Sequence, residues 1–303
     1  MNMNLCPPEI HSYICELACL DDGRTVGALS FVSRYFREVA RPFLYQSLLI
    51  SGSEKIATLV TKLENTPPHL RLIRHLFLST HSITRPSEYE AAKPSSALEG
   101  TAILRILTIA APTLETLSFV SASPAMSTSS ISRLFRTSFP LLRELSVSGF
   151  YPFPSSPGKM PSLERLHLHG NRNPHGLLSG GLDDACPSLT HLRISGISQA
   201  VSFAQDLRAA FSGIEDDDLF PSKIPPGVRN IVVELASQLQ ISGKPPKATV
   251  EREQSMLKLL TELTPPQGVD FSLIRGVDTL SPGESFRRDW VGRLRGASGC
   301  WSS

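Results

Sequence analysis

The sequence lacks any long hydrophobic run. No stretch approaches the ~18 uncharged apolar residues that indicate a membrane-spanning helix, so we expect no transmembrane helix. The first ten residues carry neither a basic segment nor an apolar one, and we therefore expect no signal peptide. Hydrophobic residues make up 41% and charged residues 19% of the chain, a composition typical of a folded protein rather than a disordered one.

The sequence has almost no excess of charge of either sign, and it contains few cysteines. Lys and Arg number 30 and Asp and Glu number 28, which gives a formal net charge of +2 and predicts neither a nucleic-acid partner nor an anionic membrane surface. The odd set of five cysteines favours a reducing compartment, so we expect an intracellular protein, cytoplasmic or nuclear. Cys15 and Cys19 are spaced to share a helix face. Because zinc needs about four ligands and only His11 lies nearby, we interpret them as packing residues.

Signatures of catalysis and cofactor binding are also missing. The sequence contains no GxSxG, HExxH or GxxxxGK[ST] motif and no paired-cysteine metal pattern. The acidic run Glu215–Asp218 lacks the ordered spacing of a calcium loop, and we interpret it as a solvated loop. We therefore predict a protein that is not an enzyme, with no cofactor and no metal site.

A repeat occupies the middle of the chain. Apolar residues at the first, fourth and sixth positions of a short segment recur seven times, most clearly at Leu163, Leu166 and Leu168. The seven copies begin at Tyr45, Ile73, Leu114, Leu142, Leu163, Leu189 and Val228. Four of the six steps between them fall within the roughly 20–29 residues of leucine-rich repeats. One strand and one short helix cannot bury their own apolar face, so we predict stacked copies that form a parallel-sheet solenoid with outer helices. The alternative is an ordinary α/β domain with accidental matches.

Alternate residues of a strand point to opposite faces of a sheet. We expect the fourth and sixth residues of each copy to face the core, and the third, fifth and seventh to face away from it. On two neighbouring strands this arrangement would gather basic side chains into the candidate substrate-binding site. Its five residues are Arg165, His167, His169, His191 and Arg193.

Three interpretations of this basic cluster are open. Arginine binds carboxylates and phosphates bidentately, so the cluster could dock an acidic or phosphorylated peptide. The simpler interpretation is that the histidines are incidental side chains on a solvated face. A metal site is disfavoured because no carboxylate or cysteine completes the set.

The first 43 residues follow a helical pattern. Pro7 and Pro8 suit a first helical turn, and Ile10, Ile14 and Leu17 follow along one apolar face. A further helix is expected over Thr25–Val39, before Pro42. About 40 residues are too few for a self-sufficient core, so this module must pack on the repeats, on a partner, or on both.

This N-terminal segment resembles an F-box. The matching residues are Pro7, Glu9, Ile10, Ile14, Leu17, Leu29, Val32, Ser33, Arg34, Phe36 and Pro42. The whole layout resembles the fungal F-box proteins with degenerate leucine-rich repeats, and Arg288–Leu294 followed by Gly299–Trp301 is similar to the ending of those chains. Two positions depart from the pattern, since Cys6 replaces the usual Leu and Phe36 the usual Trp. Both keep apolar character.

The resemblance implies a non-catalytic role in protein degradation. F-box proteins are substrate receptors, in which the F-box docks a Skp-type adaptor of a cullin–RING (SCF-type) ubiquitin ligase and the repeats hold a protein substrate. It assigns adaptor binding to Pro7, Glu9, Ile10, Ile14, Leu17, Leu29, Val32, Ser33 and Phe36. The alternative is a leucine-rich-repeat interaction scaffold whose degenerate F-box does not bind the adaptor.

These patterns together predict an α/β chain in three parts. Residues 1–43 form the F-box-like helical module, residues 44–275 the irregular repeat solenoid, and residues 276–303 a helical cap and tail. Helices are expected over Val250–Leu263 and Gly283–Leu294. The second of these, with Trp290, is expected to cover the exposed core at the end of the solenoid.

Overall fold

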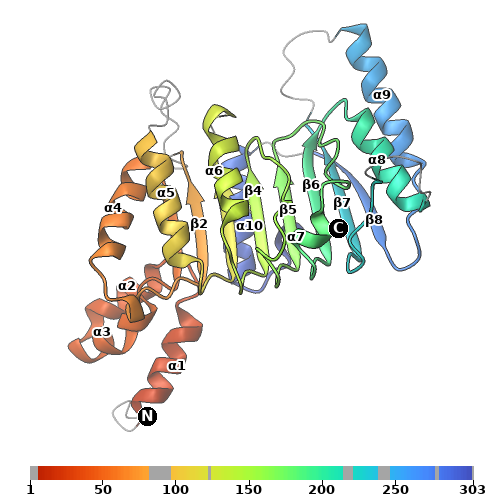
Figure 1. The fold of residues 1–303 in the computed structure, drawn as a ribbon. Coiled ribbons are helices and arrows are strands. Elements are labelled where there is room, and N and C mark those ends of the chain that lie inside the picture. The colour runs from red at the N-terminus through yellow and green to blue at the C-terminus, as the bar shows by residue number, and fades with distance from the viewer. Residues whose placement is uncertain are drawn as a thin grey trace.

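The computed structural model describes residues 6–81, 97–121, 124–213, 221–237, 246–276 and 280–301. These residues build an α/β fold around one eight-stranded, all-parallel, open sheet (Figure 1). The strands lie side by side in chain order: β1 (Ser47–Ser51), β2 (His75–Ser79), β3 (Thr116–Val120), β4 (Glu144–Ser148), β5 (Arg165–His169), β6 (His191–Ile197), β7 (Asn230–Leu235) and β8 (Asp270–Arg275). Within the described ranges, no helix is long and apolar enough to cross a membrane.

The strand register confirms the seven predicted strands. The third residue of each copy pairs directly with the third residue of the next, from Ser47 on β1 to Asn230 on β7. An eighth strand continues the series with Asp270 opposite Asn230. Residues at equivalent positions therefore form rows that run across the whole sheet.

Helices cover one face of this sheet and enclose the main core. They are α4 (Ser53–Glu64), α5 (Ala97–Ala110), α6 (Pro124–Arg136), α7 (Leu182–Ala185), α8 (Val201–Ser212) and α9 (Lys247–Thr261). The strands contribute their fourth and sixth residues to this core, such as Leu166 and Leu168, and the helices contribute residues such as Ile106 and Phe203. All four of these side chains are fully buried. We call the opposite face of the sheet, which carries the third, fifth and seventh residues, the inner face.

The turns that follow β4 and β5 lie in close contact. A Cβ built on Gly170 would lie 2.2 Å from the carbonyl oxygen of Gly149, and Gly170 has a φ of +122°. Glycine is therefore required there by both space and conformation. Next to it, the Asn171 side chain donates to Tyr151 O at 2.9 Å and accepts from Tyr151 N at 3.4 Å, which satisfies the loop backbone after β4.

The N-terminal module consists of α1 (Pro8–Ala18), α2 (Arg24–Val32), α3 (Arg34–Ala40) and the short helix η2 (Arg41–Phe43). The single helix predicted over Thr25–Val39 is wrong, because Ser33 is extended and separates α2 from α3. Its hydroxyl accepts a hydrogen bond from Phe36 N at 3.1 Å. Serine favours such a helix cap over a place inside a helix, because its side chain competes for backbone hydrogen bonds.

The module has a small core of its own and is joined to the first strands. Cys15 and Cys19 are only 2% and 1% exposed and pack with Val26 and Ala40, which confirms their interpretation as packing residues. Arg74, just before β2, bonds Glu16 of α1 at 2.6 Å. The Gln46 amide donates to the Glu16 carbonyl at 3.0 Å.

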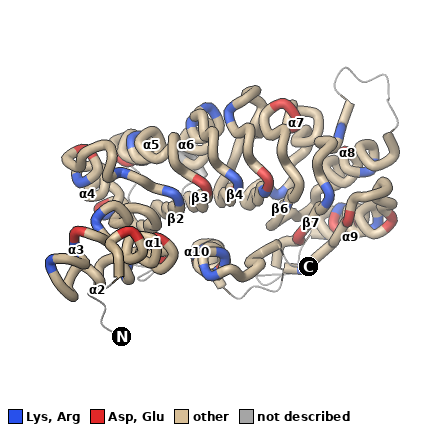
Figure 2. The backbone as a smooth tube through the Cα atoms, turned by 90° about the horizontal axis from the view of Figure 1, so that it is seen from below, with Lys and Arg blue, Asp and Glu red and all other residues tan. Residues whose placement is uncertain are grey.

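The C-terminal helix α10 (Pro282–Leu294) and the turn η6 (Gly299–Trp301) lie on the inner face. The helix itself was predicted, but its expected place at the end of the repeats is wrong. Helix α10 contacts β2, β3 and β4, on the side of the sheet opposite α4, α5 and α6 (Figure 2). The physical reason is an apolar patch at Phe77 and Val120, which Trp290 and Phe286 cover.

Candidate binding surfaces

Helix α1 carries two apolar faces with opposite environments. His11, Cys15 and Cys19, spaced four residues apart, are buried against the rest of the module. Ile10, Ile14 and Leu17 are 47%, 53% and 55% exposed. The face that the sequence predicts from its isoleucines therefore exists, and it points to solvent rather than into the chain's own core.

Further large apolar side chains of the module are exposed. Phe31 and Val32 at the end of α2 are 86% and 65% exposed, and Tyr13 and Tyr35 on α1 and α3 are also exposed. Contiguous exposed apolar surface marks interaction sites in many proteins. The sequence prediction missed Tyr13, Phe31 and Tyr35. Tyr13 could have been found from its spacing, three residues after Ile10 and four before Leu17.

The nine predicted adaptor-binding residues divide by exposure. Seven of them are exposed: Pro7, Glu9, Ile10, Ile14, Leu17, Val32 and Ser33. Leu29 and Phe36 are half-buried. Leu29 packs against the module's small core, and the Phe36 ring lies 5.6 Å from that of His11. These two residues therefore stabilise the module itself.

On the inner face, the structure brings the predicted basic cluster together. Arg165 pairs with His191, and His167 with Arg193, across β5 and β6. His167 Nε2 and His169 Nδ1 lie 2.7 and 3.1 Å from Ser195 Oγ. The five residues are thus neighbours on two strands, and His167 and His169 share the Ser195 hydroxyl as a hydrogen-bond partner.

The chain's own C-terminal segment, residues 280–301, covers this cluster. The Phe286 ring stacks on His167 at 4.7 Å between centroids and 21° between planes. Trp301 meets His167 and His191 edge-on at 6.3 and 6.1 Å. As a result His167 is 4% exposed, and the surface predicted to be open is occupied.

Both arginines of the cluster face carboxylates. Arg165 lies 3.5 Å from Glu144, and Arg193 lies 2.6 Å from Glu234. Arg193 also donates to the backbone carbonyl of Cys300 in the C-terminal segment. Docking of an acidic or phosphorylated peptide stays a prediction, and such a peptide would have to compete with these glutamates.

Glu144 is the acceptor at the centre of the inner face, and sequence reasoning missed it. Its carboxylate accepts from Arg293 Nε at 3.0 Å and from Trp301 Nε1 at 3.1 Å. Its side chain is only 12% exposed. The available signal was its place in the row of third residues, next to Arg165 on the following strand.

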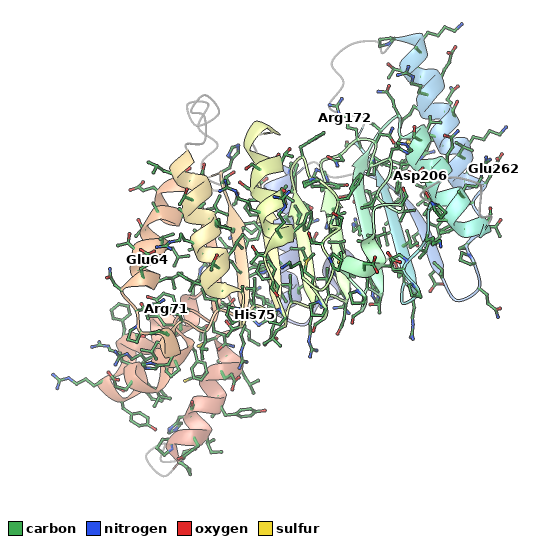
Figure 3. The ribbon with its side chains drawn as sticks, in the orientation of Figure 1. Glu64, Arg71, His75, Arg172, Asp206 and Glu262 are labelled. Atoms are coloured by element: carbon green, nitrogen blue, oxygen red, sulfur yellow. The ribbon has the colours of Figure 1, made fainter. Side chains whose placement is uncertain are left out.

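Burial on the inner face favours the neutral forms of its histidines and of Cys300. Burial, with the neighbouring charge of Arg193, lowers the pKa of His167 and His169. Burial lowers the pKa of His75 to about 4; its ring lies 3.0 Å from Thr116 Oγ1, at the start of β2 (Figure 3). Burial raises the pKa of the Cys300 thiol to about 12. At neutral pH these imidazoles are therefore uncharged and the Cys300 thiol is protonated.

Across the described ranges, no three His, Cys, Asp or Glu side chains are grouped so that they could hold a metal ion.

Among known proteins, no family model matches the chain, and no curated protein is similar to it in sequence. Function is therefore inferred from two surfaces: the exposed apolar face of the N-terminal module and the covered inner face of the sheet.

Proposed function

We propose that the chain is the substrate-receptor subunit of an SCF-type cullin–RING ubiquitin ligase. In this proposal the N-terminal module is an F-box that docks a Skp-type adaptor, and the strands that follow are irregular leucine-rich repeats that hold a protein substrate. The observation that carries the proposal is the exposure of Ile10, Ile14 and Leu17 on α1, which are motif residues of the F-box resemblance.

Exposed apolar side chains on a small module are well suited to a partner. Burying apolar surface contributes roughly 25 cal/mol per Å², and aromatic residues dominate many interface centres. In addition to the isoleucines, the module exposes the aromatic side chains of Tyr13, Phe31 and Tyr35. Because His11, Cys15 and Cys19 already supply its own core, adaptor binding would not need the module to unfold.

The attachment of the module to the sheet suits a receptor that works by proximity. Glu16 on α1 holds both Arg74 and Gln46, so the adaptor-facing helix is fixed relative to the repeats. A ligase of this kind raises the effective concentration of substrate lysines near the ubiquitin-loaded enzyme. The chain itself would perform no chemistry.

The repeat proposal rests on the strand pattern. Seven copies with apolar first, fourth and sixth residues lie in register along one parallel sheet. Stacked repeats of this kind present extended surfaces for binding other proteins. The inner face is the surface on which a substrate would be recognised.

The test is co-purification of the intact chain with a Skp-type adaptor. We expect a stable complex that is lost in the double variant Ile10→Asp, Ile14→Asp, because two charges would enter the apolar contact. The matched control is Leu98→Asp, Leu141→Asp, two exposed apolar residues outside the module, which should bind as the wild type does. A well-folded wild-type chain that forms no complex would instead favour the interaction scaffold. The observation that favours this alternative is the contact of Phe36, a motif residue, with His11 inside the module, where it is not available to an adaptor.

A further inference from the structure

The C-terminal segment packs in a hydrophobic cluster that is separate from the main core. Phe286 and Trp290 belong to a separate small cluster with Phe77 and Val120. The main core lies between the other face of the sheet and α4–α9, and its strand residues are buried there by those helices. The segment is therefore an addition to a core that is already enclosed.

The segment is fixed to the inner face by a few specific contacts. Trp290 packs on Phe77 with 5.9 Å between ring centroids, and Phe286 stacks on His167. One turn after Trp290, Arg293 reaches the buried carboxylate of Glu144, at 3.0 Å. On α10 these three segment residues are spaced i, i+4 and i+7, so they share one helix face.

The fit of this segment is incomplete. In the part of the chain that the structure describes, four buried polar atoms of the interface have no hydrogen-bond partner: Ser118 Oγ, Arg165 Nε, Arg193 Nε and Trp290 Nε1. A small cavity lined by Ser118, Glu144, Trp290 and Cys300 lies between the segment and the sheet. Unpaired buried polar atoms are costly, so these four atoms weaken the docking of the segment on this face.

We propose that the inner face is a groove for an amphipathic helix that carries two aromatic side chains one turn apart and an arginine one turn further on. The chain's own C-terminal segment is the resident, displaceable occupant of this groove. The proposal deepens the proposed function by naming the substrate class. Binding of the helix involves no adaptor, so the two proposals can fail separately.

The charges of the groove favour a basic aromatic helix over an acidic peptide. Arg165 and Arg193 already face Glu144 and Glu234, so they are not free to bind an acidic ligand. When Arg293 leaves, the buried carboxylate of Glu144 loses a cationic partner, and a cation of the ligand must take the place of Arg293. The segment follows β8 after a short connection, so its high effective concentration compensates for its imperfect fit. A partner helix must supply better contacts or be present at high concentration.

The test uses the full chain and a fluorescent peptide of residues 280–301. In the variant Phe286→Ala, Trp290→Ala the resident segment is weakened, so we expect the peptide to bind roughly tenfold or more tightly than it binds the wild type, because the free groove is more populated. The matched control Arg295→Ala, an exposed residue of the same segment, should bind as the wild type does. Adding Glu144→Gln to the opened variant should remove the gain.

Three results would overturn the proposal: equal peptide affinity for the wild type and the opened variant, no effect of Glu144→Gln, or binding of an acidic phosphopeptide but not of the segment peptide. Circular dichroism would verify that the variants are folded. Hydrogen exchange of the unmodified chain gives an independent test. We expect the amides of α10 to exchange faster than those of α5 and α6; equal protection would contradict a displaceable segment.

Discussion

Trp301 donates its indole N–H to the Glu144 carboxylate at 3.1 Å, which joins the last described turn of the chain to the fourth strand of the sheet. The same carboxylate binds Arg293. The two tryptophans of the chain, Trp290 and Trp301, both lie in the C-terminal segment. Tryptophan fluorescence therefore reports on this segment alone.

Removing the charge of Glu144 should loosen the C-terminal segment. Hydrogen bonds to charged groups contribute about 1.5–3 kcal/mol, so we expect Glu144→Gln to weaken docking by about this amount and to shift tryptophan emission to the red. Glu115→Gln is the control, because Glu115 forms only a half-exposed pair with Arg74 at 3.7 Å, and such pairs contribute about 0–1 kcal/mol. Unchanged emission in Glu144→Gln would contradict the central role of this carboxylate.

Acidification should also release the segment. Burial and Arg193 lower the pKa of His167 and His169 below 6.5, so the undocked state binds more protons as the pH falls. Docking is fully present above pH 6.5 and is lost progressively below it. We expect a red shift of tryptophan emission as the pH falls below 6.5, before the far-ultraviolet circular dichroism changes.

A matched variant separates this effect from general acid unfolding. His167→Gln removes the most deeply buried of these histidines, so its emission should depend less steeply on pH over the same interval. Burial lowers the pKa of His75 to about 4, and that group weakens the fold itself as the pH falls from 6.5 towards 4. Identical pH profiles for the wild type and His167→Gln would contradict this assignment.

The alternation of the repeat could be predicted from the sequence, and so could the rows across the sheet. Apolar residues at the fourth and sixth positions, such as Leu145 and Val147, are stable only on a buried face. The short-range pattern was therefore enough to predict which face of each strand is buried. The same pattern places Phe77 and Val120 on the inner face, together with Leu49 and Val232, as apolar exceptions among the polar residues there. What covers Phe77 and Val120 lies more than 160 residues later in the chain, and local periodicity contains no information about such a contact.

The N-terminal module shows a different limit. Both faces of α1 are apolar, and the sequence does not state which one the chain buries for itself. Ile10 and Ile14 are the stronger hydrophobes, yet His11 and Cys15 are buried, and the His11 ring bonds the Tyr35 hydroxyl of α3 at 2.8 Å. Ser33 is a helix-cap residue type, and that signal could have placed the break between α2 and α3.

Truncation inside the main core should destabilise the whole fold. Leu168 is fully buried between the sheet and its helices, and such a Leu→Ala change costs about 2–5 kcal/mol. Leu141→Ala, at a half-exposed position, should change the unfolding free energy by less than about 0.5 kcal/mol. Urea unfolding followed by circular dichroism measures both, and equal losses would contradict the assigned core.

The close turns after β4 and β5 give a second stability test. Gly170→Ala would place a Cβ 2.2 Å from the Gly149 carbonyl oxygen, so the backbone must move and we expect a loss of more than about 3 kcal/mol. Gly158→Ala is the matched control: its φ is +66° but nothing lies within 4 Å of its Cβ, so it carries only the left-handed strain of about 1 kcal/mol. Similar losses in the two variants would show that the turns do not touch.

The most direct test of the proposed receptor function is hydrogen exchange of the intact chain with and without a Skp-type adaptor. The proposal predicts that protection on complex formation concentrates in Pro8–Ala18 and Arg24–Val32, which carry the exposed apolar residues. The strands and α10 should exchange as they do in the free chain. Protection of the inner face without protection of α1, or no change at all with a folded adaptor in excess, would contradict the proposal that this module docks the chain onto a ubiquitin ligase.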